Sequence, residues 1–173
     1  MKFSWFRFII WIIIGLPPIY LKAQCADSIH YALSKRMTNY NIKTTLDDKN
    51  NLLESIQPIH FVNQTNVDIT RLQFYMYLNS FKNTESSFLK GTTKIFGNQF
   101  SNRRLDEWGW ISIEKITRDI HLNNVDLTEN LKYIQCDDGN LNDQSVIEVL
   151  LNDIIAPGDT AIFHLKWKAK IPK

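Results

Sequence analysis

The sequence predicts an all-β protein: a saddle-like β-sandwich of about seven or more mostly antiparallel strands, preceded by a signal peptide. Three observations lead to this fold class. Apolar residues alternate with a period of two through most of the chain. Clusters of Asn, Asp, Gly and Pro separate the alternating runs, as turns do. The length of 173 residues, with 44% hydrophobic and 22% charged residues, is ordinary for one globular domain.

Residues 1–23 have the pattern of a signal peptide. A basic segment with Lys2 and Arg7 precedes the apolar run Phe8–Leu16, and Ala23 offers a small residue at a cleavage site. A membrane-spanning helix needs about 20 apolar residues, and this run is shorter. Two alternatives stay open, an uncleaved membrane anchor and a lipid anchor on Cys25, although Gln24 is not the usual residue before a lipidated cysteine.

Cleavage would change the charge of the protein. The segment 1–23 removes three of the 20 Lys+Arg residues and no acid, which leaves 17 bases against 18 acids and a net charge of −1. A near-neutral chain gives no case for nucleic-acid binding or for long-range charge steering. We expect an exported protein that is periplasmic, outer-membrane-associated or secreted, with no stable transmembrane span after signal cleavage.

Two cysteines, Cys25 and Cys136, are too few for a disulfide scaffold or a four-cysteine zinc site. In an oxidising compartment they could pair and close a long loop. Unpaired cysteines, one of them buried in a strand, are the other interpretation.

Residues 24–38 form a lead-in, and the domain itself spans 39–173. Its first half holds alternating runs at 40–47, 56–63 and 69–78, each of which predicts a strand. In the first, Tyr40, Ile42, Thr44 and Leu46 share one face. Pro58 cannot donate a ladder hydrogen bond, so the second strand is expected at a sheet edge or to begin there. In the third, Leu72, Phe74, Met76 and Leu78 share one face, while Tyr75 and Tyr77 indicate that the other face is covered too.

The alternation is lost over residues 80–107, where a short helix near 85–90 is possible and scattered apolar residues indicate partial packing. Further strands are expected at 110–116, 131–136, 146–151 and 160–171. Polar segments separate them: a break at 126–130, a tight hairpin turn at 137–140 and a Pro-Gly turn at 156–159.

No catalytic, cofactor-binding or metal-ligating residue is predicted for this chain. The four histidines are His30, His60, His121 and His164, and no two are spaced as helical zinc ligands. The sequence holds no His-Glu-x-x-His, no Gly-rich phosphate loop, no Gly-x-Ser-x-Gly and no Cys-x-x-Cys. We therefore expect no enzyme activity from the chain alone.

Four weaker patterns each have a structural interpretation that is favoured. His60 and His164 lie in predicted strands as structural histidines. The segment 137–140 followed by Asp143 resembles a calcium loop but lacks its terminal glutamate, so a turn is preferred. Asp106 and Glu107 beside Arg103 and Arg104 indicate a solvated surface cluster. Trp108 and Trp110 could stack on a carbohydrate, but core packing is the preferred interpretation.

The order of several short motifs resembles one family. They run from about Asn39 to Lys173 and include Tyr40-x-Ile42-x-x-x-Leu46-Asp47, Ile59-x-Phe61-x-Asn63, Leu72-x-Phe74-x-x-Tyr77-Leu78-Asn79, Ser80-Phe81-Lys82-Asn83, Glu85-Ser86-Ser87-Phe88, Trp108-Gly109-Trp110-Ile111-x-Ile113, Asp137-Asp138-Gly139-Asn140-x-x-Asp143-Gln144, Leu151, Pro157-Gly158-Asp159 and Lys170-Ile171-Pro172. The set resembles the N-terminal domain of secreted bacterial members of the aminopeptidase N family, the gluzincin zinc metallopeptidases.

The resemblance implies a saddle-shaped β-sandwich that packs on a thermolysin-like catalytic domain, in the same polypeptide or as a separate chain. Zinc, its ligands and the general-base glutamate would belong to that domain, so no site residue is carried over. The chain ends after a strand where the family sandwich continues, and we expect the domain to lack one or two strands and to leave an exposed edge.

Two functions of different class follow. In the first, the chain is a non-catalytic N-terminal domain that supports the catalytic domain of an exported zinc aminopeptidase-like protein. In the second, it is a standalone exported β-sandwich that binds a protein, peptide or glycan through the 80–107 loop and the aromatic residues near Trp108. A large exposed apolar patch would favour the first function, and a polar surface with an aromatic cleft the second.

Overall fold

The computed structural model describes residues 35–173, apart from 98–99, 101, 122 and 136–137. The predicted signal peptide at 1–23, most of the lead-in, and both Cys25 and Cys136 lie outside the described residues. The signal, the two anchor alternatives and the cysteine pairing therefore stay predictions. Within the described part, every helix is too short or too polar to cross a bilayer.

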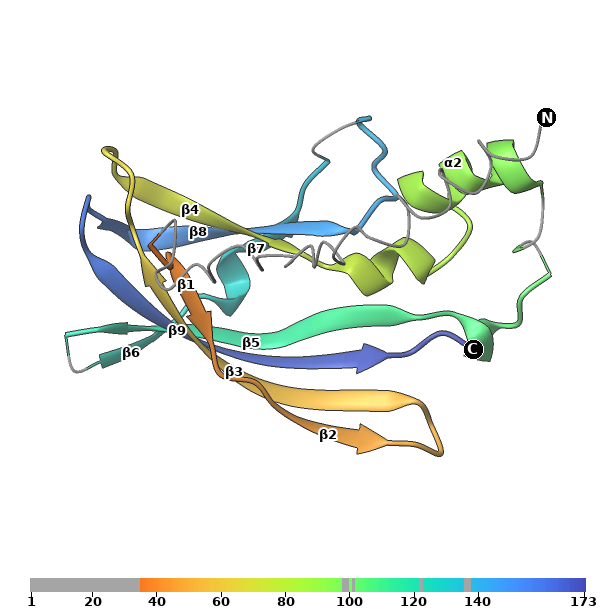
Figure 1. The fold of residues 1–173 in the computed structure, drawn as a ribbon, viewed down its shortest axis with the longest axis horizontal. Coiled ribbons are helices and arrows are strands. Elements are labelled where there is room, and N and C mark those ends of the chain that lie inside the picture. The colour runs from red at the N-terminus through yellow and green to blue at the C-terminus, as the bar shows by residue number, and fades with distance from the viewer. Residues whose placement is uncertain (1–34, 98–99, 101, 122, 136–137) are drawn as a thin grey trace, which may run out of the picture. The chain divides into compact units, whose positions relative to one another are not determined.

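Two antiparallel sheets form the fold (Figure 1), which confirms the predicted all-β sandwich. The larger sheet contains six strands, in which β1 and β2 both pair with β3 and the order continues β3-β9-β5-β6. The smaller sheet has the order β4-β8-β7. The strands are β1 (Thr38–Tyr40), β2 (Lys43–Asp47), β3 (Leu52–Val62), β4 (Ile69–Tyr75), β5 (Trp110–Ile120), β6 (Asn123–Asp126), β7 (Leu131–Tyr133), β8 (Val146–Ile155) and β9 (Thr160–Lys170).

The core lies between the two sheets. Phe163 on β9, Ile116 on β5 and Val149 on β8 are fully buried at its centre. Leu72 and Phe74 on β4 pack against the same cluster from the small sheet, as the period-two pattern predicts. The alternation along β3, β4 and β9 therefore places one set of side chains in the core and the other on an outer face.

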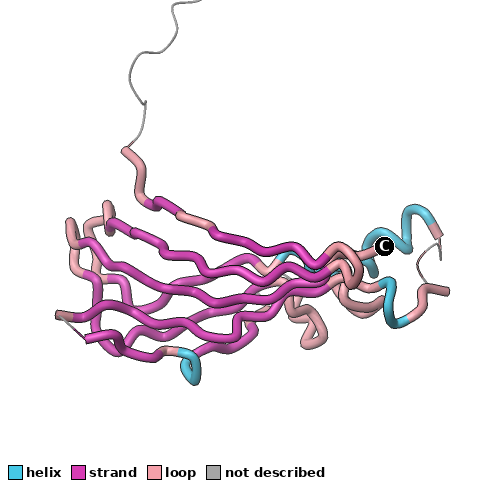
Figure 2. Tube along the Cα trace, turned by 90° about the horizontal axis from the view of Figure 1, so that it is seen from below, coloured by secondary structure: helices cyan, strands magenta, loops and turns pink. Residues whose placement is uncertain are grey.

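Helical segments join the strands. These are α2 (Ser87–Phe96) and the 3-10 turns η1 (Tyr77–Phe81), η2 (Leu105–Glu107) and η3 (Thr128–Asn130). Figure 2 shows that α2, η1 and η2 gather at one end of the sheets. The hydroxyl of Ser86 caps α2 by accepting a hydrogen bond from Leu89 N at 3.2 Å. The helix expected near 85–90 thus begins slightly later than predicted and extends further.

The predicted strand at 40–47 is divided, and the face that was expected to make it half-buried is exposed, with Tyr40, Ile42 and Leu46 at 59%, 55% and 58%. The prediction for Pro58 is also wrong. β3 is an interior strand, paired with β9 on one side and with β1 and β2 on the other. Residues 41 and 42 separate β1 from β2 directly opposite Pro58, and Asn41 N donates to Pro58 O at 3.1 Å. The neighbouring strand is therefore interrupted where the proline has no N–H to offer.

Several other predicted boundaries differ: β3 begins earlier than the predicted strand at 56–63, β5 and β8 extend beyond 110–116 and 146–151, and β6 was not predicted. The strand expected at 69–78 ends at Tyr75, because the chain turns into η1. The strand expected at 131–136 ends at Tyr133. β7 and β8 are antiparallel neighbours, as a hairpin requires, but β8 begins only at Val146, so their connection is longer than the tight turn predicted at 137–140, of which Asp137 lies outside the described residues. The predicted turn at 156–159 is confirmed: Asp159 N donates to Ala156 O at 3.0 Å and Gly158 has a φ of 86°.

Candidate functional site

The outer face of the small sheet carries a ladder of polar and aromatic side chains. The strand register places Gln73 on β4 opposite Glu148 on β8, and Glu148 opposite Lys132 on β7. Arg71 and Tyr75 flank Gln73 on the same face, because side chains two residues apart in a strand point the same way. We call this surface the tyrosine face; it comprises Arg71, Gln73, Tyr75, Tyr77, Lys132 and Glu148.

Glu148 is the centre of the polar row. It is only 3% exposed, although it lies on an outer face, because neighbouring side chains cover it. Its carboxylate is 3.1 Å from Lys132 Nζ and 3.7 Å from an Arg71 Nη1, and it accepts a hydrogen bond from Gln73 Nε2 at 3.3 Å. The hydrogen bonds from Lys132 and Gln73 and the two cationic charges hold the pKa of Glu148 below its usual value.

Arg71 and Lys132 keep most of their side chains in solvent, with exposures of 62% and 55%. Together the two cations have about eight N–H donors, five on Arg71 and three on Lys132, which exceeds the roughly four acceptor sites of the Glu148 carboxylate. The row therefore presents free donors to solvent while Glu148 fixes their positions. That arrangement suits a ligand that is rich in hydrogen-bond acceptors.

Tyr75 and Tyr77 stack on each other next to this row. Their ring centroids lie 5.4 Å apart and their planes differ by 8°. The two residues are 67% and 71% exposed, so the prediction that this face of the strand is covered is wrong. Parallel rings support each other and leave an aromatic surface open to solvent.

A buried asparagine fixes the turn that carries Tyr77. Asn79 is 2% exposed, and its side chain donates to Gln144 O and accepts from Ile111 N, both at 2.9 Å. Just before the turn, Met76 N donates to Ser145 O at 2.7 Å. These bonds tie η1 to the connection before β8 and to β5. The backbone that carries the Tyr77 ring is therefore fixed by hydrogen bonds to the rest of the protein.

A second candidate surface is a shallow hollow of about 300 Å³ on the outer face of the large sheet. Its lining includes Ile56, Lys115, His164 and Lys166. Both lysines here have an acidic partner: Lys115 is 3.7 Å from Asp126, and Lys166 is 2.9 Å from Glu114. His164 Nε2 lies 3.0 Å from Asp119 Oδ2. The polar groups of the lining are thus already partnered, which makes this hollow the weaker candidate.

Trp108 does not form the binding surface that the sequence suggested. It is 9% exposed and lies under the guanidinium of Arg103, which is 5.7 Å from the ring centroid. The next residue, Gly109, donates to Phe81 O at 3.0 Å. Core packing, the preferred interpretation for Trp108, is therefore confirmed, and the aromatic residues around it offer no open platform.

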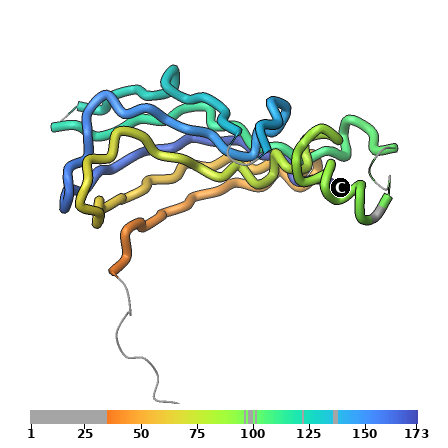
Figure 3. Tube along the Cα trace, turned by 90° about the horizontal axis from the view of Figure 1, so that it is seen from above, coloured from red at the N-terminus to blue at the C-terminus, as the bar shows by residue number. Residues whose placement is uncertain are grey.

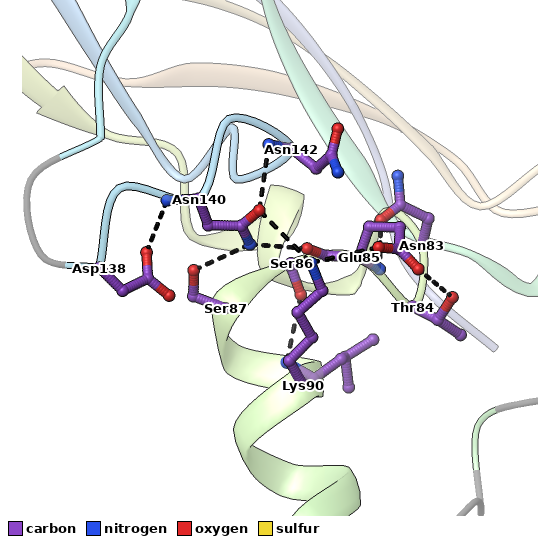
Figure 4. Close-up of polar contacts among 10 residues, drawn as sticks. Asn83, Thr84, Glu85, Ser86, Ser87, Lys90, Asp138, Asn140 and Asn142 are labelled. Carbon is purple, nitrogen blue, oxygen red and sulfur yellow. Dashed lines mark hydrogen bonds and ion pairs between the residues drawn. The ribbon is translucent and has the colours of Figure 1, made fainter.

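In the segment that resembles a calcium loop, Asn140 is engaged in hydrogen bonds within the protein (Figure 4). Asn140 Nδ2 donates to Glu85 O at 2.8 Å and to Ser87 Oγ at 3.1 Å, and its backbone N–H donates to Asp138 Oδ1 at 3.0 Å. A hydrogen bond from Ser87 lowers the pKa of the Asp138 carboxyl. Asn140 thus fastens this connection to the start of α2, and Asp137 lies outside the described residues.

The remaining sequence candidates are on the surface. Arg104 pairs with Asp106 at 3.2 Å and with Glu107 at 3.6 Å, which confirms the predicted solvated cluster. His60 is exposed on β3, and His164 contacts Asp119. Among the residues that the structure describes, no group of three or more His, Cys, Asp or Glu side chains is arranged to hold a metal ion.

Sequence reasoning missed the tyrosine face, although one signal for it was present. Glu148 is the only charged residue in the run Val146–Leu151. A lone acid among apolar residues needs partners when its strand packs in a sandwich. Its partners Arg71 and Lys132 come from other strands, and only the pairing of those strands with β8 brings them together.

No family model and no curated protein matches the chain. Solved structures with partial similarity are carbohydrate-binding modules. The CBM3a-L domain with flanking linkers from scaffoldin cipA of the Clostridium thermocellum cellulosome has a TM-score of 0.35 and 8% identity, covering 78% of this chain and 67% of that chain. A family IIIA CBD from Clostridium cellulolyticum has a TM-score of 0.34 and 12% identity, covering 78% and 72%. The function proposed below rests on the chain's own residues.

Proposed function

We propose that the chain is a non-catalytic, exported β-sandwich binding module that takes a glycan on the tyrosine face. The observation that carries this proposal is the stacked pair Tyr75–Tyr77, more than two thirds exposed, beside a row of ordered polar side chains. Contiguous exposed apolar surface, here formed by two stacked rings, is typical of ligand-binding and interaction sites.

A sugar ring matches both parts of the surface. Its C–H face is apolar and packs on an aromatic ring, while its hydroxyl groups accept and donate hydrogen bonds. The exposed ends of Arg71, Lys132 and Gln73 supply donors beside the rings. Because Glu148 already holds these side chains in place, a ligand would lose little free energy in ordering them.

Affinity electrophoresis of the purified domain tests this proposal. Gels containing soluble neutral or acidic polysaccharides should retard the wild type, and Tyr75→Ala combined with Tyr77→Ala should migrate as in a gel without polysaccharide. Phe88→Ala, which removes an aromatic side chain that is 50% exposed on α2, serves as the matched control and should keep the retardation. Equal retardation of the wild type and the double variant would refute the assignment of this face.

The aminopeptidase N-type interpretation is our second proposal, in which the chain supports a gluzincin catalytic domain. One feature favours it: Tyr40 and Leu46 are apolar, share one face and are 59% and 58% exposed. A blot of cell fractions with an antibody against residues 36–173 tests it. A native polypeptide several times larger than 20.3 kDa would support a peptidase domain, whereas a band near that size would leave only the separate-chain version.

A further inference from the structure

The small sheet covers only part of the large one. One row across the large sheet is Tyr40 on β1, Ile59 on β3, Phe163 on β9 and Arg118 on β5. Ile59, Phe163 and Arg118 are 3%, 0% and 8% exposed, but Tyr40 is 59% exposed. The part of the large sheet that is buried under the small sheet therefore ends between β3 and β1. Within the described residues, no strand of the small sheet buries the inner face of β1.

The strand at this boundary is β4, and its outer edge is free. Within the described residues β4 pairs only with β8. Met76 N donates to Ser145 O on the β8 side. In an antiparallel pair the backbone groups of alternate residues face the same neighbour, so those of Phe74 and Leu72 also face β8. The backbone groups of Arg71, Gln73 and Tyr75 therefore point to the open side. Figure 3 shows β1 and β2 in orange lying outside β4, on the side of this free edge.

We propose that this free edge of β4 accepts one extended segment of a partner polypeptide as a fourth strand of the small sheet. Such a strand would lie about 4.8 Å from β4 and would stand above β1. Its backbone would satisfy the open amides and carbonyls of Arg71, Gln73 and Tyr75. Its inward side chains would cover Tyr40, which lies next to the buried Ile59.

A second copy of this chain does not fit the same edge through its own β4. In a symmetric β4–β4 pair, the partner's β4 would stand where the added strand stands, above β1. Ile59 of β3 belongs to the core cluster against which Leu72 of β4 packs, so β3 faces β4 from the other sheet. In a symmetric pair, β1 of one copy and β3 of the other would therefore need the same place. A single extended peptide has no second layer and avoids this clash.

The residues below and beside the free edge of β4 specify the chemistry of the partner segment. On the inner face, β1 and β2 present Thr38, Tyr40, Thr44 and Leu46, none of which is charged. Inward positions of the partner should therefore be apolar. On the outer face the added strand would run beside Arg71, whose side chain is 62% exposed, so an acidic residue fits an outward position there.

A labelled peptide tests the proposal by fluorescence anisotropy. The probe alternates valine with threonine and has one central glutamate in place of a threonine. We expect it to bind the wild type, and Tyr40→Glu to weaken it at least about tenfold by placing a charge on the apolar floor. Ile56→Glu is the control, because Ile56 is 57% exposed on the opposite face of the same sheet and should leave binding unchanged.

Two N-methylated probes test the backbone contact. They carry methyl groups on alternate amides, in the two possible phases, and only the phase that leaves the amides facing β4 free should bind. Equal binding of both phases, equal effects of Tyr40→Glu and Ile56→Glu, or no binding of the unmethylated peptide up to about 1 mM would each overturn the proposal. A protein that dimerises with loss of peptide binding would assign the edge to a second copy instead. Polysaccharide retardation of Tyr40→Glu should stay as in the wild type, which separates this edge from the tyrosine face.

Discussion

Glu148 and Lys132 are paired across β8 and β7, with Glu148 Oε1 3.1 Å from Lys132 Nζ. The carboxylate is covered by its neighbours, and the ammonium is more than half exposed. The acid thus orders a cation that remains available to a ligand. This pair also links the stability of the small sheet to the protonation state of one side chain.

The pKa of Glu148 in the folded protein is lowered, so the pair stabilises the fold above the unfolded value of about 4.3. That contribution is lost as the pH falls through the lower, folded value. We expect Glu148→Gln to melt below the wild type at pH 7, and the difference to shrink as the pH falls below about 4. Thermal melts of both proteins from pH 7 to pH 2 measure this. Glu129→Gln, at an exposed acid in η3, controls for the replacement of a carboxylate by an amide outside the Glu148–Lys132 pair. A difference independent of pH would contradict the assignment.

Arg118 connects the two sheets through the core. It donates from Nη1 to Asp153 O and from Nη2 to Ile154 O at 3.3 Å, and its guanidinium lies 5.9 Å from the ring centroid of Phe163. Arg118→Ala leaves two carbonyl groups without these donors and creates a cavity, which should lower the free energy of unfolding by about 3 kcal/mol.

Arg118→Met separates the effect of the cavity from that of the lost hydrogen-bond donors. Methionine fills most of the space of the arginine side chain, but it has no donor and no charge. We expect it to cost about half as much as the alanine variant in urea denaturation. Arg118 Nε has no hydrogen-bond partner in the described part of the chain, so its loss offsets part of the cost. An alanine variant within about 0.5 kcal/mol of the wild type would show that Arg118 does not hold the sheets.

Asn63 joins the β3–β4 turn to the end of β8. Its side chain is fully buried; Nδ2 donates to Val67 O and Ile155 O at 2.8 Å, and Oδ1 accepts from Thr65 N at 3.0 Å. Asn63→Ala should cost about 3 kcal/mol. Asn63→Asp should cost at least as much at pH 7 despite its equal size, because a carboxylate oxygen would face two carbonyl oxygens. Urea denaturation compares the two, and an aspartate variant as stable as the wild type would show that these hydrogen bonds do not hold the turn.

Position 109 requires glycine because residues 170 and 172 pass close to its Cα. A Cβ built there would lie 2.6 Å from Pro172 Cδ and 3.0 Å from Lys170 O. Gly109→Ala should therefore destabilise the protein by about 2 kcal/mol. Gly91 in α2 is the matched control, because a Cβ there meets nothing within 4 Å, and Gly91→Ala should stabilise the protein by about 0.5–1 kcal/mol. Melting temperatures that move in the same direction for both variants would contradict this account.

The sequence was sufficient to predict most of the strands and the inner faces of β3 and β4. Leu72 and Phe74, like Ile59 and Phe61, are two residues apart, and this spacing correctly indicated that they pack in the core. The same spacing wrongly placed Tyr40 and Leu46 on a half-buried face, and β6 was not predicted. The Pro-Gly turn before β9 was also predictable, because those two residues restrict the backbone locally. Each of these features depends on residues near one another in the chain.

Other features required the pairing of distant strands. Pro58 looked like an edge residue, yet β3 is interior, since a break between β1 and β2 removes the conflict. Whether Tyr75 and Tyr77 are covered depends on what lies over the small sheet, which a period of two cannot specify. The partners of Glu148 likewise come from β4 and β7.

The sequence by itself thus determined the fold class, the alternation within each strand and the absence of familiar catalytic motifs, because these follow from local periodicity and spacing. Only the tertiary structure decided which strands are neighbours and where the small sheet stops. That boundary leaves Tyr40 uncovered beside the buried Ile59 and exposes the edge of β4. Burial depends on the number of strands stacked above a residue, and no local pattern in the chain encodes that number.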